Sequence, residues 1–135
     1  MKYNLSIKCI ETALPKNSFR ISSLKKKNPT WDIKKIIEKT GIEKIWYTKK
    51  HQTALDLGLE ASKKVLKKFN KTSIDTLIYI TQSPEYFLPS GACILQHKLG
   101  LKNNVKALDI NLGCSGFVYG LFVACSLVQN KMSKN

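Results

Sequence analysis

The sequence predicts an α/β fold with a mostly parallel sheet and a long apolar helix near its C-terminal end. Strand-like apolar runs alternate with helix-like patterns along the 135 residues. The run at residues 77–80 is continuously apolar, as in a strand that is covered on both faces. Residues 117–128 are apolar around nearly the whole circumference of a helix. This alternation indicates parallel strands joined by right-handed helical crossovers.

The N-terminal third of the chain predicts one strand and one helix. Residues 3–14 begin with an apolar–polar alternation, which predicts a strand. The lysine-rich residues 16–30 predict a solvated loop. Thr30 is the expected N-cap of a helix over residues 31–39, and Gly41 is expected to end it.

The middle of the chain predicts a short extended piece at residues 42–47 and a helix that Thr53 caps. Apolar residues in this helix recur with a period near 3.6: Leu57, Ala61, Val65 and Phe69. After the strand at 77–80, Pro89 is expected in the first turn of a helix that ends at Leu99. A strand at residues 105–110 then leads into the long apolar helix.

A candidate functional site follows the two predicted parallel strands. The loop at residues 81–89 and the turn at 111–114 both lie beyond carboxyl ends of strands, where open α/β sheets bind ligands. We therefore expect them to converge. Cys114 is placed where the turn becomes the helix, and a helix N-terminus stabilises a thiolate. Cys114 is thus a candidate nucleophile, and the alternative is a small buried apolar residue.

The apolar helix at residues 117–128 needs more cover than a single small sheet provides. We expect one side of it to face water unless a second copy or a second half of the fold covers it.

Composition and charge narrow the functional classes. The chain has 23 Lys+Arg against 9 Asp+Glu, a formal net charge of +14. That charge would suit an acidic protein partner or nucleic acid. However, Arg20 is the only arginine and no nucleic-acid-reading motif is present, so we expect no nucleic-acid partner.

The four cysteines form no CxxC motif and have no histidine at zinc-finger spacing, so we expect no metal. Without a signal peptide or a run long enough to span a bilayer, the sequence predicts a cytoplasmic protein with reduced thiols and no membrane association.

Four ordered blocks of sequence resemble the ketosynthase III family, the 3-oxoacyl-acyl-carrier-protein synthase III type of condensing enzyme. Residues 109–119, DINLGCSGFVY, resemble the family's nucleophile segment. The TGI at residues 40–42 and the segments 53–66 and 74–100 resemble the blocks that precede it. The resemblance covers about residues 40–121.

The resemblance implies the N-terminal half of a thiolase-like fold, in which the nucleophile-bearing helix is buried, and a homodimer. It implies an acyltransferase of fatty acid biosynthesis that works with an acyl carrier protein. Cys114 would accept the acyl group, and a decarboxylated malonyl thioester would then attack it in a Claisen condensation. No cofactor is implied beyond acyl-CoA or acyl-carrier-protein thioesters as substrates.

The chain departs from the family pattern in the region after Cys114. The family's catalytic histidine and asparagine lie in the second half of the fold, and neither His51 nor His97 lies in a matching segment. We therefore expect residues 1–135 to be a single domain, an N-terminal half without its C-terminal half, and inactive alone. The alternative function is a non-catalytic half-fold module that dimerises.

The resemblance also implies three substrate-binding residues. Lys39 takes the place of an arginine that precedes the threonine of TGI, and a lysine meets a phosphate as a point charge. Trp31 lies too far upstream to align with the family's adenine-stacking tryptophan. Leu88, with its neighbour Phe87, matches the position that reaches toward the partner subunit's acyl pocket, and ordinary packing is the alternative for both.

Overall fold

A computed structural model describes residues 5–135 of the chain. Its internal contacts divide the chain into two compact units, Leu14–Gln52 and the remainder, and each is described by itself. The expectation that residues 1–135 form one domain stays a prediction.

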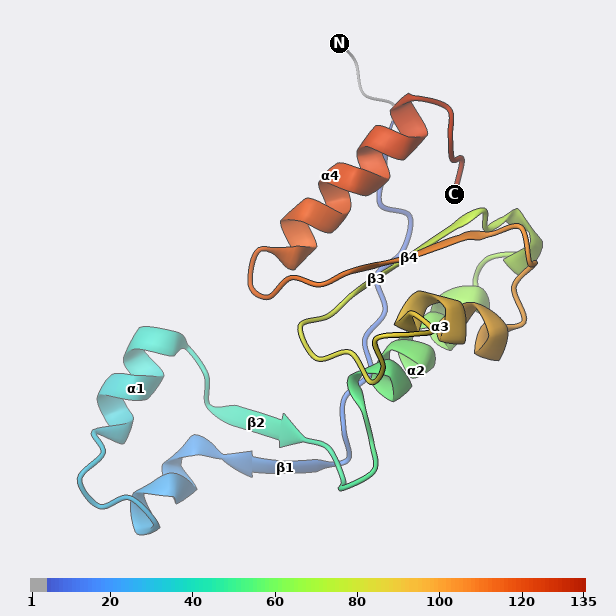
Figure 1. The fold of residues 1–135 in the computed structure, drawn as a ribbon. Helices are drawn as coiled ribbons and strands as arrows, with labels where there is room; N and C mark the ends of the chain where they lie inside the picture. Colours follow the sequence, from blue (N-terminus) through green and yellow to red (C-terminus); the bar gives the residue numbers. More distant parts are fainter. Residues whose placement is uncertain (1–4) are drawn as a thin grey trace. The chain divides into compact units, whose positions relative to one another are not determined.

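The larger unit is a layered α/β structure built on a parallel pair of strands. Strand β3 pairs in parallel with β4, and Tyr79 lies opposite Asp109 in the register. Helices α2 and α3 cover one face of the pair and α4 covers the other (Figure 1). The elements of this unit are α2 (Ala54–Leu66), a 3-10 turn (Lys71–Ser73), β3 (Thr76–Ile80), α3 (Gly91–Leu99), β4 (Lys106–Ile110) and α4 (Gly116–Gln129). The α/β fold class and the parallel pairing are confirmed.

The core of this unit lies between the strand pair and helices α2 and α3. Leu55 on α2 and Leu95 on α3 are 1% and 2% exposed. The ring of Tyr79 lies so close to α3 that a Cβ on Gly91 would come within 2.6 Å of it. Ile80, the next residue, contacts α4, because successive side chains of a strand point to opposite faces.

Capping residues define where the helices of the larger unit begin and end. Thr53 caps α2 as predicted, in a reciprocal capping box with Asp56. Helix α3 begins at Gly91 rather than at Pro89, because the hydroxyl of Ser90 accepts the N–H of Cys93. Gly100 ends α3 with φ +62°, the left-handed conformation that favours glycine.

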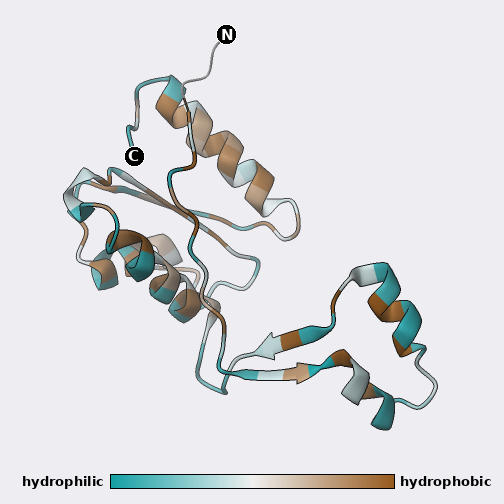
Figure 2. Cartoon of the chain, turned by 180° about the vertical axis from the view of Figure 1, so that it is seen from behind, coloured by the Kyte–Doolittle hydropathy of each residue, from teal (hydrophilic) through white to brown (hydrophobic). Residues whose placement is uncertain are grey.

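The first half of helix α4 is packed on one side only. Gly116 and Gly120 are its buried residues, and both lie against Ile80 of β3. In Figure 2 most residues of the helix have the colours of apolar residues. Apolar and aromatic side chains on its other side are exposed: Phe117, Val118, Tyr119, Leu121 and Phe122. The expectation that one side would face water is confirmed, so in this chain the burial implied by the family resemblance extends to one side of the helix.

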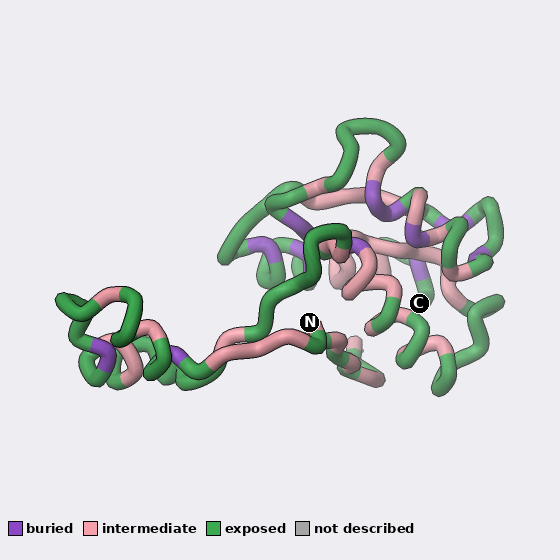
Figure 3. The backbone as a smooth tube through the Cα atoms, turned by 90° about the horizontal axis from the view of Figure 1, so that it is seen from below, coloured by how far each residue is buried: buried purple, intermediate pink, exposed green. Residues whose placement is uncertain are grey.

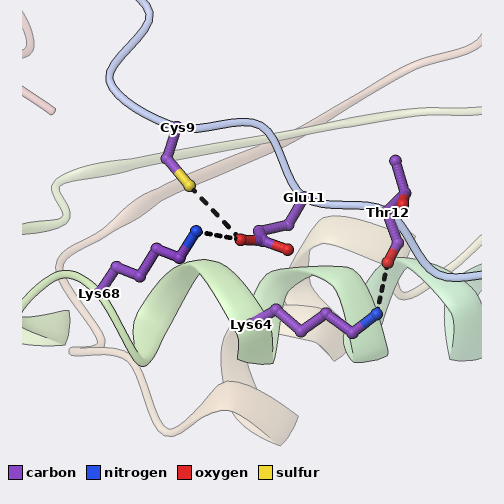
Figure 4. Close-up of polar contacts among 5 residues, drawn as sticks. All are labelled: Cys9, Glu11, Thr12, Lys64 and Lys68. Atoms are coloured by element: carbon purple, nitrogen blue, oxygen red, sulfur yellow. Dashed lines mark hydrogen bonds and ion pairs between the residues drawn. The ribbon is translucent and has the colours of Figure 1, made fainter.

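The predicted strand at residues 3–14 is wrong over the part that the structure describes. Residues 5–14 form no strand, and residues 3 and 4 lie outside the described residues. Side chains of α2 and the residues just after it hold this segment instead (Figure 4): Lys64 Nζ donates to Thr12 O at 2.6 Å, and Lys68 Nζ pairs with Glu11 Oε1 at 2.5 Å. The alternation of side chains was present, but a strand also needs backbone partners on a neighbouring strand.

The C-terminal segment returns to the start of β3, where the Asp75 carboxylate holds it. Asp75 accepts the hydroxyl of Ser133 and the backbone N–H groups of Lys134 at 2.7 Å and Asn135 at 3.4 Å. Burial alone would raise the pKa of Asp75, but these hydrogen bonds outweigh it and hold the pKa below its usual range.

The smaller unit is an antiparallel ribbon with two helical segments. Its elements are β1 (Asn17–Arg20), a 3-10 helix (Ile21–Lys26), α1 (Ile33–Thr40) and β2 (Lys44–Tyr47). Strands β1 and β2 pair from Asn17 opposite Tyr47 to Arg20 opposite Lys44. The prediction of a loop over residues 16–30 is therefore wrong in part, because Asn17–Arg20 form a strand. This strand is mostly polar, so it lacks the apolar pattern by which a core strand is recognised in a sequence.

Helix α1 begins two residues later than predicted. Asp32, not Thr30, is its N-cap, and the Asp32 carboxylate accepts the N–H of Lys35 at 3.1 Å. Gly41 ends the helix as predicted, with φ +68° and its N–H bonded to Ile37 O at 2.7 Å.

Buried positions are few and lie between long half-buried and exposed segments (Figure 3).

None of the helices within residues 5–135 has the length and apolar character needed to cross a membrane.

Candidate active site

The candidate nucleophile lies on a short turn between β4 and α4. After β4 ends, Leu112 N–H bonds back to Ile110 O at 3.1 Å, and Gly116 N–H bonds to Gly113 O at 2.9 Å. Cys114 lies inside the turn that the second of these hydrogen bonds closes, and it is exposed. The turn therefore presents a free thiol to solvent beyond the carboxyl end of a parallel strand.

The structure corrects the placement of Cys114 relative to the helix. Helix α4 begins at Gly116 with Ser115 as its N-cap, so Cys114 precedes the cap instead of opening the helix. The Ser115 side chain makes no capping hydrogen bond. The Gly116 N–H is bonded to Gly113 O, and the N–H groups that follow it in the first turn of a helix have no partner within the helix, so they are able to meet an anion.

Close packing of α4 on β3 fixes the direction of the helix after the turn. A Cβ on Gly116 would lie 2.7 Å from Ile80 Cγ2, and a Cβ on Gly120 would overlap Ile80 Cδ1. The two glycines therefore let the helix backbone approach the strand more closely than any larger residue would.

The loop after β3 and the turn after β4 meet, as predicted. Thr81 N–H bonds to Ile110 O at 3.2 Å, which continues the strand pairing by one residue. The Gln82 side chain then lies against the turn, because a Cβ on Gly113 would be 2.5 Å from Gln82 Oε1. A carboxamide group is thus placed against the residue next to Cys114.

The predicted acyl-contact residues, Phe87 and Leu88, form the exposed tip of this loop. Phe87 is 97% exposed and Leu88 is 86% exposed. Both side chains lie in solvent, so the alternative of core packing within this chain does not hold for them, and the expected contact with a partner subunit stays a prediction.

Lys39, the predicted phosphate contact, belongs to the smaller unit. Together with Trp31, Asp32, Lys35 and Ile36 it lines a shallow groove of about 390 Å³ along α1. Lys35 and Lys39 are four residues apart on α1 and lie on one face of it, whereas Trp31 precedes the N-cap Asp32 and reaches the groove from outside the helix. The groove brings Trp31 to Lys39, although Trp31 does not align with the family's stacking tryptophan.

Two residues of the site were missed from the sequence. One is Gln82, whose position against Gly113 depends on a contact between distant segments. The other is Asp109, whose carboxylate accepts the N–H groups of Gly91 and Ala92 at 2.7 Å each. A carboxylate among the apolar residues near the end of a strand is the signal that would have drawn attention to Asp109.

The fold agrees with the family comparisons. The family described as "Chalcone and stilbene synthases, N-terminal domain" matches this chain over residues 22–134. The chain belongs to this family, and the resemblance to the ketosynthase III type is confirmed by its relatives.

Beta-ketoacyl-[acyl-carrier-protein] synthase III of Fusobacterium nucleatum is 38% identical over 134 residues, which cover 98% of this chain and 40% of the relative. A crystal structure of a 3-oxoacyl-(acyl-carrier-protein) synthase III matches with a TM-score of 0.88 and 39% identity, covering 96% of this chain and 39% of the other. The structure of a 3-oxoacyl-(acyl-carrier-protein) synthase from Burkholderia xenovorans matches with a TM-score of 0.82 and 29% identity, covering 93% and 37%.

These matches confirm the N-terminal half of a thiolase-like fold. The chain spans about 40% of the length of the Fusobacterium relative.

Proposed function

We propose that the chain carries the acyl-accepting nucleophile of a 3-oxoacyl-acyl-carrier-protein synthase III-type acyltransferase, and that this nucleophile is Cys114. One observation carries the proposal. The Cys114 thiol is exposed on the turn beyond β4, where the loop after β3 meets it, in a chain related to such synthases. Open α/β sheets bind ligands at this edge, beyond the carboxyl ends of their strands.

The proposed reaction has two covalent steps. The Cys114 thiolate attacks the carbonyl carbon of an acyl thioester, a new C–S bond forms, and the donor thiolate leaves and takes up the proton that Cys114 gave up. Loss of carbon dioxide from a malonyl thioester on an acyl carrier protein then supplies a carbanion. The carbanion attacks the acyl carbon, the C–C bond forms and the Cys114 thiolate is released. Covalent catalysis divides one difficult step into two easier ones.

We also propose that the groove along α1 binds the nucleotide end of a CoA thioester. The groove offers the Trp31 ring as a stacking surface for a base, and the Lys35 and Lys39 ammonium groups as contacts for phosphates. Lysines meet phosphates as point charges, so we expect weaker geometric selection than with an arginine fork. This arrangement supports CoA as the donor and leaves the carrier protein as the malonyl donor.

The exposed loop tip supports a contact beyond this chain. Following the family resemblance, we propose that Leu88, with Phe87, reaches the acyl pocket of a partner subunit in a homodimer. Their exposure, 86% and 97%, fits side chains that another chain covers.

Mass spectrometry of the protein after incubation with an acyl-CoA tests the nucleophile. We expect the mass to rise by one acyl group, with the label on the peptide that contains Cys114. Cys114→Ala should abolish the adduct, whereas Cys125→Ala, the matched control on α4, should retain it. An adduct of wild-type yield in Cys114→Ala would refute the assignment.

A non-catalytic half-fold module that dimerises is the second candidate. The exposed apolar side of α4 favours it, because such a surface suits an interface between copies. In either case we expect no condensation by residues 1–135 alone, since the family's histidine and asparagine belong to its second half. Formation of a 3-oxoacyl product by the purified chain would overturn that expectation.

A further inference from the structure

Asp109 places a carboxylate in the layer between the strand pair and helix α3. It lies opposite Tyr79 in the parallel register, and the Tyr79 ring packs against the start of α3. Asp109 is half-buried in surroundings where a charge without partners would cost free energy. Both carboxylate oxygens have partners: Oδ2 accepts Gly91 N–H and Oδ1 accepts Ala92 N–H, each at 2.7 Å.

Two side chains therefore cap the N-terminus of α3, one from the adjacent residue and one from another strand. Ser90 caps locally, since its hydroxyl accepts the N–H of Cys93 at 3.4 Å. Asp109 caps from another strand, and its shorter, charge-assisted bonds also meet the positive end of the helix dipole. Of these two caps, the Asp109 cap is the one that connects α3 to β4.

That connection joins the two segments that form the candidate active site. Helix α3 begins where the loop after β3 ends, and β4 leads to Cys114 a few residues after Asp109. The beginning of the same loop is bonded to β4 as well, through Thr81 N–H and Ile110 O at 3.2 Å. Between these anchors, Gln82 lies against Gly113. The loop is thus held at both ends by the last two residues of the strand that carries the nucleophile turn.

We propose that Asp109 is a positioning residue for Cys114: by fastening the start of α3 to β4, it holds the loop Gln82–Ser90 against the turn that carries the thiol. Its catalytic importance rests on the proposed function of Cys114. Its mechanical role does not, and it can be measured without substrate.

Hydrogen exchange of the 135-residue chain, read by mass spectrometry of its peptides, tests this role. Asp109→Asn keeps one acceptor oxygen and replaces the other with an NH₂ group, which cannot accept. We expect exchange to rise about tenfold, as for loss of one charge-assisted hydrogen bond, in residues 82–92 and also in residues 111–115.

Ser90→Ala is the matched control, because it removes the other cap of the same helix and leaves the connection to β4 intact. It should raise exchange at the start of α3 and leave residues 111–115 unchanged. The alkylation rate of Cys114 should change at least about threefold in Asp109→Asn and stay unchanged in Ser90→Ala. If the two variants showed the same pattern of hydrogen exchange, or if exchange in residues 111–115 did not change in Asp109→Asn, Asp109 would be only a helix cap.

A measurement on the unsubstituted chain covers the case in which Asp109→Asn does not fold. In hydrogen exchange measured by NMR, the amide protons of Gly91 and Ala92 should have protection factors within about threefold of those of the β4 amide protons. The reason is that the start of α3 and β4 should open in the same local unfolding event. Protection lower by about a hundredfold would overturn the proposal. These readouts use no acyl donor, so failure of Cys114 acylation with the coupling intact would count against the proposed function alone.

Discussion

Substitution of Gly120 tests how closely α4 packs on β3, and therefore what orients the helix after Cys114. A Cβ at this position would overlap Ile80 Cδ1 and lie 3.3 Å from Ile80 Cγ1. Overpacking a core contact costs about 1–3 kcal/mol, and the better helix propensity of alanine returns up to about 1 kcal/mol. We expect Gly120→Ala to lower the free energy of unfolding by roughly 1 kcal/mol, with an upper bound of about 2 kcal/mol.

A double-mutant cycle with Ile80→Val isolates the contact. Valine lacks Cδ1, the atom that the new Cβ would meet, and Ile→Val alone costs about 0.5–1.5 kcal/mol. In the Ile80→Val background Gly120→Ala should be neutral or stabilising, which gives a coupling energy of about 1 kcal/mol or more in urea unfolding followed by circular dichroism. Gly58→Ala is the matched control, because Gly58 is also inside a helix but a Cβ there would lie 3.5 Å from its nearest neighbour, Tyr79 Cε2. It should stabilise the chain. Additive effects of Gly120→Ala and Ile80→Val would refute the close-packing argument.

Three further predictions concern stability. Gly41→Ala should cost about 1 kcal/mol because φ is +68° and no neighbour lies within 4 Å, and Gly41→Asn should cost less in thermal unfolding; equal costs would contradict the backbone argument. Asp75→Asn should cost about 1–3 kcal/mol at neutral pH. Since the folded pKa of Asp75 is lowered, this contribution is fully present above the unfolded pKa of about 4 and is lost as the pH falls through the folded pKa, so a wild-type advantage that does not shrink as the pH is lowered from about 4 would contradict it. Glu11→Gln should leave the free energy of unfolding close to that of the wild type, because its pair with Lys68 lies at the surface, and a clear loss in urea unfolding would show that this pair anchors the N-terminal segment.

Local signals predicted most elements of the larger unit. The capping box at Thr53 and the apolar run at β3 depend on neighbours in sequence, so their positions could be inferred from residues alone. Gly41 and Gly100 ended helices because each adopts a positive φ that other residues avoid.

Contacts between distant segments could not be predicted in the same way. The N-terminal alternation indicated a strand, but whether a strand forms depends on a partner edge that no local pattern encodes. Likewise, Asp109 is an isolated charge in an apolar run until the start of α3 is placed over it. The candidate nucleophile was recognisable, whereas the residues that hold its surroundings were not.

Alkylation rates of the four cysteines test the central claim about Cys114 most directly. Cys93 and Cys114 are both exposed, so the ratio of their rates removes the effect of accessibility, and Cys9 and Cys125 are half-buried references. With iodoacetamide at neutral pH and peptide-resolved mass spectrometry, Cys114 should react at least about tenfold faster than Cys93. A Cys114 that reacts no faster than Cys93, Cys9 or Cys125 would contradict its assignment as the nucleophile and favour the association module.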